Sequence, residues 1–539
     1  MHPRHAVSFL GMAIIALSLC AQAQTFRFNS QRTGNAAQGI RLPLQRVQTV
    51  KGGGAFVSSP VVVNDTVYVG CRDSCLYAFH KSNLLWRFRT RGWVDASVAY
   101  DNGRIYCGSR DGCLYILKAS NGDSLGVIEN GNTQCSSPLV YDSTIVFGRG
   151  GWNNEIKAWN VHTGAYRWHT NNTQMVYSTP AFDNGQIFYG ENGGNLVSCD
   201  ALSGVKKWEF QTNGCFYLSS PAVEQGLVYC SPGEYNRTVF CVDANTGLEV
   251  WSAVPGAEAG HAVANAGFVR RLMTQSPDYR SRMVAGASRL YKMLPEQVEA
   301  LAAIAGPTLG KAAFTSFGAV ASSSPAIGET DVFVVHMEYG YPSPMFTLTA
   351  FDKLNGQEQW HFSEQRTCME IGICASPVVA DSVVFAGWGQ GKLYAFHAET
   401  GDLLWQDSLG SDIIASPAIG NGKLYAATAD GRLVAYASAV RSDDFQRRTY
   451  CYPNPAKGES VHIRIFTPAA GQADIIVYNS VERPVIRFAK KLPAMQASDE
   501  EIFDWNLKGV ANGVYFVRIK MTYDNGRTEK KVLKIAVLK

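Results

Sequence analysis

The sequence predicts an all-β protein, an eight-bladed β-propeller with a small helical insertion followed by a C-terminal immunoglobulin-like β-sandwich. Three observations support this prediction. A unit of short apolar strands and Gly-rich turns recurs eight times, which is typical of a repeat built from β-sheets. The 539 residues include 51 Gly, and only 17% are charged, which suits a chain with many tight turns. After residue 450 the repeat gives way to alternating strands of another spacing.

Each unit opens with Ser-Pro or an equivalent pair, which an apolar strand follows. The first residues of these pairs are Ser59, Ser97, Ser137, Thr179, Ser220, Ser324, Ser376 and Ser416. Most units contain four strands, and four strands match one propeller blade. Consecutive starts lie 38 to 42 residues apart, except for 104 residues between the fifth and sixth and 52 between the sixth and seventh.

Most units end in a strand that carries a Trp. Five of these Trp residues follow a turn Gly by four positions, and the Gly residues are Gly164, Gly204, Gly247, Gly356 and Gly401. Gly supplies the positive φ that such a hairpin turn needs. We expect the large rings to dock between neighbouring blades, and the set is Trp86, Trp168, Trp208, Trp251, Trp360 and Trp405. The second unit has Gly126 in the Trp slot, so we expect looser packing there.

The eighth unit lacks its last strand. The stretch LQRVQTV precedes the first unit, and its Val47 stands 12 residues before Ser59, the same offset as that from Trp208 to Ser220. We therefore expect the N-terminal strand to complete the eighth blade and close the ring, which removes an exposed sheet edge.

The string Ala/Asp-x-x-x-Gly-x-x-x-Trp resembles the tryptophan-docking repeat of the quinoprotein (PQQ-type) propellers, over roughly residues 44–438 without the insertion. That family includes quinoprotein alcohol dehydrogenases and a non-enzymatic propeller lipoprotein of the outer-membrane β-barrel assembly machinery. A dehydrogenase would need PQQ with calcium, calcium-binding acids and amides, a catalytic Asp and, often, two adjacent Cys. No two Cys are adjacent here.

Other signatures of catalysis are also missing from the sequence. There is no HExxH, Walker lysine loop, GxSxG or EF-hand string. We therefore expect no cofactor, no metal and no catalytic residue, and we favour a non-enzymatic binding or scaffold module for a protein, peptide or glycan. The PQQ- and calcium-dependent dehydrogenase is the alternative, and a purely structural surface protein is a third hypothesis.

The two ends of the chain suggest an export route. Charged residues, an apolar run and Ala21-Gln22-Ala23 predict a signal peptide at 1–23. The propeller is expected at 24–440, a linker at 441–450 and a second domain at 451–539. In that domain YPNP (452–455) and ANGVYFVRI (511–519) resemble the C-terminal sorting domain of type IX secretion cargo of Bacteroidetes-type bacteria. The resemblance implies the type IX machinery as a partner, and a protein that is secreted or attached to the outer-membrane surface, via the periplasm.

Several partner classes are not expected. The net charge is +4 without a long basic run, so no nucleic acid is predicted. After the N-terminal segment the sequence contains no run of about 18 apolar residues, so no transmembrane segment is predicted.

Residues of about 252–321 form an insertion with helical character, either a packed cap over the ring or a partner-binding element.

A recognition surface is expected where the loops between second and third strands meet the connections between blades. The candidate binding residues are Trp93, Trp152, Tyr177, Phe216, Tyr217, Tyr235, Glu338, Tyr339 and Trp388. Aromatic side chains with a few charges are typical of such surfaces, although each of these residues could instead fill structural space. The insertion is expected to border this face near Tyr217, Tyr235 and Tyr339.

The 13 Cys residues allow two interpretations. In an oxidising compartment, disulfides are permitted. Cys71 and Cys75 flank one hairpin turn, and Cys107 and Cys113 flank another, so each pair could form a cross-hairpin disulfide. Small buried β-strand residues are the other possibility for all four.

Overall fold

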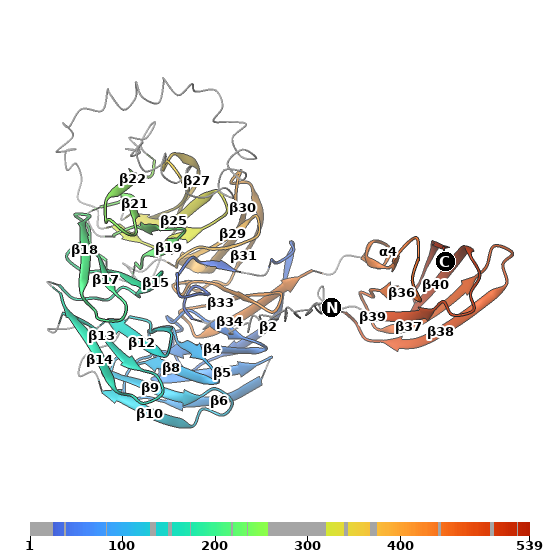
Figure 1. Ribbon diagram of the computed structural model, residues 1–539, viewed down its shortest axis with the longest axis horizontal. Helices are drawn as coiled ribbons and strands as arrows, with labels where there is room; N and C mark the ends of the chain where they lie inside the picture. The colour runs from blue at the N-terminus through green and yellow to red at the C-terminus, as the bar shows by residue number, and fades with distance from the viewer. Residues whose placement is uncertain are drawn as a thin grey trace, which may run out of the picture.

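The computed structural model describes residues 25–36, 39–81, 83–129, 136–148, 154–172, 174–216, 219–233, 236–256, 320–338, 343–366, 375–439, 444–495, 501–524 and 526–538. Its strands form a ring of antiparallel blades and a second β-domain (Figure 1). The predicted all-β class is confirmed. Among the described residues no helix is long and apolar enough to cross a membrane.

Each blade has its shortest strand on the inside and its Trp-bearing strand, where one exists, on the outside. Blade 1 contains β3 (Val61–Val63), β4 (Thr66–Cys71), β5 (Cys75–His80) and β6 (Asn83–Arg89). Blade 2 contains β7 (Ala99–Asp101), β8 (Arg104–Gly108), β9 (Cys113–Lys118) and β10 (Ser124–Glu129). Blade 3 contains β11 (Leu139–Tyr141), β12 (Thr144–Gly148), β13 (Glu155–Asn160) and β14 (Tyr166–Asn171). Blade 4 contains β15 (Ala181–Asp183), β16 (Gln186–Gly190), β17 (Asn195–Asp200) and β18 (Lys206–Gln211).

The second half of the ring follows the same order. Blade 5 contains β19 (Ala222–Glu224), β20 (Leu227–Cys230), β21 (Val239–Asp243) and β22 (Glu249–Ala253). Blade 6 contains β24 (Ala326–Ile327), β25 (Asp331–Glu338), β26 (Met345–Asp352) and β27 (Glu358–Gln365), with β23 (Val320–Ser322) added to β25. Blade 7 contains β28 (Val378–Ala380), β29 (Val383–Trp388), η2 (Gly389–Gly391), β30 (Lys392–His397) and β31 (Leu403–Ser408). Blade 8 contains β32 (Ala418–Gly420), β33 (Lys423–Ala427) and β34 (Arg432–Ser438).

The N-terminal strand completes blade 8, as the sequence predicts. Strand β2 (Leu44–Lys51) pairs with β34 in antiparallel register, from Leu44 opposite Ser438 to Lys51 opposite Arg432. The outer strand of the last blade therefore comes from the start of the chain, and the ring is closed by main-chain hydrogen bonds.

A closed circle of hydrogen bonds joins the inner ends of all eight blades. The backbone N–H of each unit-opening residue donates to the side-chain hydroxyl of the opening residue of the next blade, at 2.9 to 3.2 Å. The circle runs through Ser59, Ser97, Ser137, Thr179, Ser220, Ser324, Ser376 and Ser416, and the last bond returns from Ser416 N to Ser59 Oγ. The eight predicted unit starts are thus the eight contact points of the ring.

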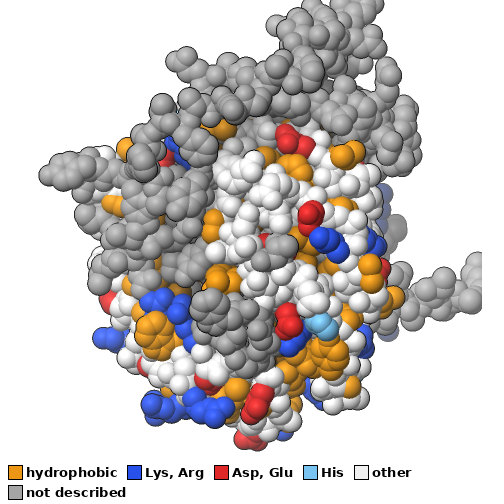
Figure 2. All heavy atoms as spheres, turned by 90° about the vertical axis from the view of Figure 1, so that its left-hand side faces the viewer, with side chains coloured by type: hydrophobic (Ala, Val, Ile, Leu, Met, Phe, Trp, Pro, Cys, Tyr) orange, Lys and Arg blue, Asp and Glu red, His pale blue; other side chains and the backbone are white. Residues whose placement is uncertain are grey.

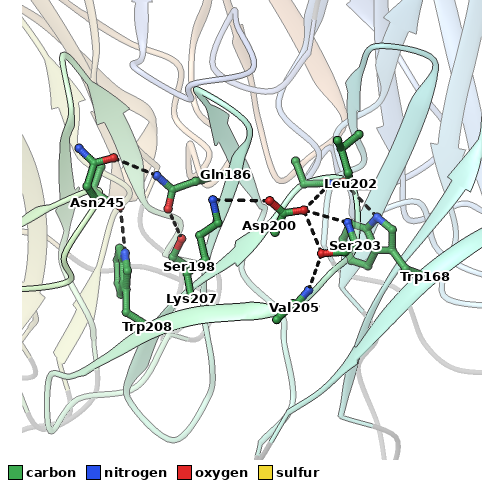
Figure 3. A network of polar contacts seen from close by, with 12 residues as sticks. Trp168, Gln186, Ser198, Asp200, Leu202, Ser203, Val205, Lys207, Trp208 and Asn245 are labelled. Carbon is green, nitrogen blue, oxygen red and sulfur yellow. Dashed lines mark hydrogen bonds and ion pairs between the residues drawn. The ribbon is translucent and has the colours of Figure 1, made fainter.

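The docking Trp residues join the outer parts of the blades, each to the blade that follows. The Trp168 Nε1–H donates to the Ala201 carbonyl at 3.0 Å (Figure 3), and its indole lies against Gly204, where a Cβ would come within 2.5 Å of the ring. Five other indoles donate in the same way, from Trp86, Trp208, Trp251, Trp360 and Trp405. For four of the six Trp residues the receptor is the Ala-x-x-Gly turn of the next blade, whereas Trp251 donates to the Lys353 carbonyl of a Lys-x-x-Gly turn and Trp405 to the Leu44 carbonyl at the start of β2.

Blade 2 shows how the contact is replaced when the Trp is missing. Six Trp residues lie opposite Ala, Ser or Cys on the neighbouring strand, whereas Gly126 lies opposite the larger Ile116. The receptor turn of blade 3 has open space at Gly164, and the Val161 carbonyl accepts a hydrogen bond from Arg104 Nη1 at 2.9 Å. A guanidinium thus takes over the hydrogen bond of the absent indole.

The predicted sandwich follows the ring with a core of its own. Helix α4 (Asp444–Arg448) precedes one sheet of β35 (Tyr450–Tyr452), β36 (Ser460–Ile465) and β39 (Glu501–Asn506). The other sheet contains β37 (Gly471–Tyr478), β38 (Pro484–Leu492), β40 (Gly513–Tyr523) and β41 (Thr528–Val537). The buried cluster between them, which includes Phe445 and Trp505, is drawn from this domain alone. The side chain of Asn454 in the YPNP motif binds the backbone of β41 through two hydrogen bonds. It donates to the Lys534 carbonyl and accepts from the Ala536 N–H.

Most of the predicted insertion lies outside the described residues. Its first two residues, 252 and 253, still belong to β22, and its last residues, 320 and 321, belong to β23. The expected helices, and their place beside the binding face, therefore stay predictions.

Trp251 gives the sharpest test of the docking contact because it is completely buried. We expect Trp251→Ala to lower the free energy of unfolding of the ring by roughly 3 to 5 kcal/mol, as for other buried aromatic residues. The control is Leu248→Ala in the same hairpin, whose side chain is 62% exposed. Urea unfolding of both variants measures the difference, and equal midpoints would contradict the docking role.

Candidate binding face

The loops between second and third strands meet the connections between blades on one face of the ring. Arg72 and Arg110 lie in two such loops, after β4 and β8, and Trp93 lies in the connection from β6 to β7. The backbone N–H of Arg110 donates to the Trp93 carbonyl at 2.8 Å. These two kinds of segment therefore share a face, as the repeat predicts.

Trp93 forms the most exposed aromatic contact on this face. Its ring is 45% exposed and carries two guanidinium groups, with the Cζ atoms of Arg72 and Arg110 at 4.9 and 5.4 Å from the ring centroid. Such cation–π contacts hold Trp and Arg side chains in fixed positions. We refer to Arg72, Trp93, Asp95 and Arg110 as the Trp93 cluster.

Asp95 fixes the two arginines of the Trp93 cluster. Its side chain is only 7% exposed, and it accepts from Arg72 Nε at 3.1 Å and from Arg110 Nη2 at 2.7 Å. One carboxylate thus serves two guanidinium groups, so the cluster keeps a net positive charge. The Nε of Arg110 is buried and has no hydrogen-bond partner within the described parts of the chain.

A second feature of the face is a groove between blades 5 and 6, with a volume of about 270 Å³. Blade 6 has longer strands than the other blades and so forms one side of the groove. Its β25, β26 and β27 each have eight residues, whereas the second strands of the other blades have four to six. Arg237 and Glu338 form an ion pair in this groove. Glu338, one of the predicted binding residues, thus lies in the wall of this groove, and its binding role stays a prediction.

His336 forms the buried floor of the groove. Its Nε2 lies 3.2 Å from Ser231 Oγ, and its Nδ1 has no hydrogen-bond partner among the described residues. Burial lowers the pKa of His336 to about 3, and the nearby charge of Arg237 acts in the same direction. The imidazole is therefore neutral at physiological pH and can donate or accept a hydrogen bond.

Two predicted binding residues are corrected, because Phe216 and Trp388 are buried. Phe216 packs over Gly190, where a Cβ would come within 2.1 Å of its ring. Other blades use a smaller apolar residue over the equivalent Gly: these pairs are Val94 over Gly70, Val176 over Gly148 and Ile413 over Gly387. Trp388 stacks on Phe362 at 5.9 Å between ring centroids. Both aromatic side chains fill space between blades.

The remaining candidates are only partly placed. Tyr177 is half-buried, and its hydroxyl donates to Met175 Sδ at 2.9 Å. Trp152, Tyr217, Tyr235 and Tyr339 lie outside the described residues. Figure 2 shows one side of the molecule, on which hydrophobic, basic and acidic side chains are interspersed without a broad area of one kind.

The disulfide interpretation is wrong for this structure, in which Cys71, Cys75, Cys107 and Cys113 are free, buried thiols. Cys71 lies opposite Cys75 in its hairpin. Cys107 lies opposite Tyr115 and not opposite Cys113, so Cys107 and Cys113 are not directly paired across their strands. Burial raises the pKa of the Cys71 thiol to about 12, which makes it a poor nucleophile. The four residues act as small buried side chains.

The described residues do not fit the cofactor of the dehydrogenase alternative. Calcium takes six to eight oxygen ligands, and no group of three or more His, Cys, Asp or Glu in the described ranges could hold a metal ion. A cavity of about 10 Å³ between Arg27 and the inner strands of blades 1 and 8 has room for a single water molecule and not for a fused-ring quinone. No chemical step is therefore derived through this cofactor.

An eight-bladed ring with docked indoles defines the class of PQQ-like repeat propellers. A family model described as outer membrane protein assembly factor BamB matches residues 30–252 and 296–450, which is well over half of the chain. The chain belongs to this family.

Curated relatives match over short segments, and the chain spans about a tenth to a third of their length. Lupanine 17-hydroxylase (cytochrome c) of Pseudomonas sp is 27% identical over 168 residues, 31% of this chain and 22% of that protein. BamB of Bordetella pertussis is 23% identical over 137 residues, 23% of this chain and 31% of that protein. The relatives therefore include both a hydroxylase and an assembly factor.

Solved structures show the same fold at low identity. BamB from Moraxella catarrhalis has a TM-score of 0.52 and 13% identity, over 74% of this chain and 99% of that chain. Quinohemoprotein alcohol dehydrogenase from Comamonas testosteroni has a TM-score of 0.56 and 15% identity, over 78% and 81% of the two chains. At this identity the likeness shows the fold alone.

His336 makes the stability of the ring depend on pH. The pKa of this side chain is about 3 in the folded protein and about 6.5 in an unfolded chain, so the unfolded state binds more protons between these values. The stabilising contribution is complete above about pH 6.5 and is lost as the pH falls toward 3. The free energy of unfolding of the parent should fall between pH 6.5 and 5. We expect that of His336→Gln to fall by roughly 2 kcal/mol less over the same range.

Urea unfolding over this pH range measures the effect, and the exposed His162 supplies the control. The variant His162→Gln should keep the pH profile of the parent. Parallel profiles for His336→Gln and the parent would contradict the assignment.

Proposed function

We propose that this protein is a non-enzymatic, secreted or surface-displayed propeller that binds a protein or peptide partner on the face containing the Trp93 cluster. The carrying observation is the exposed indole of Trp93, held between two arginines that share one buried carboxylate. Trp and Arg are the residues that most often dominate binding energy at interfaces. A fixed aromatic ring also loses little conformational entropy when a partner binds.

The charge of the Trp93 cluster favours a partner that presents a carboxylate beside an apolar group. The Nε of Arg110 has no hydrogen-bond partner among the described residues, and guanidinium forms strong hydrogen bonds with carboxylates. The indole offers an apolar surface next to them. A Glu or Asp next to an aromatic residue in an extended peptide matches both features.

The C-terminal domain is proposed to be an export address. Its support is the resemblance of YPNP and ANGVYFVRI to the sorting domain of type IX cargo, together with a core that is built from its own residues. The ring, by contrast, closes with strands that end at Ser438. Binding and export would therefore belong to separate domains.

The binding proposal is tested with a fluorescein-labelled peptide that alternates Glu and Phe, and with its Lys–Phe counterpart. We expect the acidic peptide to bind by fluorescence anisotropy, and Trp93→Ala to weaken that binding at least about tenfold, as for other interface Trp residues. The control is Leu202→Ala, whose side chain is 82% exposed. Leu202 lies in the turn after β17, at the end of that strand opposite to the proposed binding face. Equal binding by Trp93→Ala and the parent, or equal binding of both peptides, would contradict the proposal.

The address proposal is tested by ending the chain after Ala439. We expect the shortened protein to keep the melting temperature of the ring, because the closing pair β2–β34 is complete. In a Bacteroidetes-type host it should collect in the periplasm, while the full chain becomes accessible to external protease. Surface display of the shortened chain at the level of the parent would refute the address role.

A further inference from the structure

The N-terminal segment before the closing strand runs through the centre of the ring. The carbonyls of Ser30, Gln31, Thr33 and Gly34 accept hydrogen bonds from the first strands of blades 4, 5, 6 and 7 in turn, at 2.7 to 2.9 Å. Strand β1 (Asn35–Ala36) then pairs with β28 in parallel. We call residues 25–36 the axial segment.

Two buried arginines anchor the axial segment. Arg32 is fully buried, and its guanidinium donates to the carbonyls of Pro138 at 3.2 Å and Pro180 at 3.0 Å. Arg27 is 4% exposed, and its guanidinium donates to the Pro325 carbonyl and, at 3.1 Å, to the Arg32 carbonyl. These proline carbonyls begin the inner strands of blades 3, 4 and 6.

These carbonyl acceptors come from the repeat itself, because the residue that follows the opening Ser or Thr of each unit lies next to the axis. The carbonyl oxygens around the axial segment concentrate partial negative charge, which suits a guanidinium with several N–H donors. Burial nevertheless lowers the pKa of both arginines to about 9, so they remain charged at neutral pH. Main-chain carbonyls thus accept hydrogen bonds from both buried cations, while Arg27 Nη1 has no hydrogen-bond partner among the described residues.

The contact between Arg27 and Gly34 shows close fitting within the segment. Gly34 has φ of 66°, and a Cβ there would lie 2.1 Å from Arg27 Nη2. A cavity of about 10 Å³ lies beside Thr25, Arg27 and Phe28. The channel therefore matches this sequence in shape as well as in charge.

We propose that the axial channel is a peptide-binding site that recognises arginine in a turn-forming segment, and that residues 25–36 occupy it in cis as a separable ligand. The strands of the ring do not need this segment for their own pairing, because β2 closes blade 8 independently. The hydrogen bonds of the segment add to those of the inner strands, as in strand addition to a sheet edge. A free peptide of the same sequence should accordingly compete for the channel.

The experiment uses the full chain with a protease recognition sequence inserted between Ala36 and Gly39. After folding and cleavage, we expect the axial segment to remain with the ring in gel filtration. A fluorescein-labelled peptide of residues 25–36 should then exchange into the channel and be displaced by its unlabelled form. The peptide with Arg32→Gln should compete at least about tenfold less well, because its charge-assisted hydrogen bonds are lost.

Ser30→Ala supplies the matched control peptide, since the segment uses the carbonyl of Ser30, which the substitution keeps. This peptide should compete like the parent. Equal competition by the Arg32→Gln peptide would overturn recognition of arginine. Release of the cleaved segment with an unchanged melting temperature, or retention without any exchange over a day, would overturn the separable site.

Discussion

The circle of eight hydrogen bonds between unit-opening residues is the constraint on which the ring depends. Each bond needs a backbone N–H and a hydroxyl at the same level of neighbouring blades, so one shifted blade would break two bonds. The bond from Ser220 to Ser324 spans 104 residues of sequence, yet at 2.9 Å it equals the bond from Ser59 to Ser97. Extra chain between blades therefore leaves the inner ring unchanged, and variation is confined to the loops and the outer parts of the blades.

Neighbouring blades also depend on one another through the docked indoles. A Trp, the small residue opposite it and the turn of the next blade form one contact, and all three parts change together where the Trp is missing. At Gly126 the opposite residue becomes Ile116, and Arg104 donates to the Val161 carbonyl in place of an indole. The packing unit of this fold is thus the interface between two blades.

The sequence predicted the elements that repeat and missed those that occur once. Blade number, closure and the Trp slots follow from spacing, because every unit obeys the same steric rules. The axial segment has no alternating pattern, and most of its partners are main-chain N–H and carbonyl groups, which the sequence does not reveal. Phe216 and Trp388 were misassigned because an aromatic residue fills interior space as well as it binds a partner. Asp95, which binds the two arginines beside Trp93, gave no signal in a single sequence.

Blade 8 holds the entry and the exit of the ring side by side. Leu44 begins one strand, Ser438 ends its neighbour, and the two residues are opposite one another. Tension applied to the C-terminal domain therefore enters the ring at this pair and loads the β2–β34 seam one hydrogen bond at a time. β34 also pairs with β33, so the two seams of this strand are the first part of the ring to bear a load applied through the tail. A transport apparatus that pulls on the tail would meet its first resistance there.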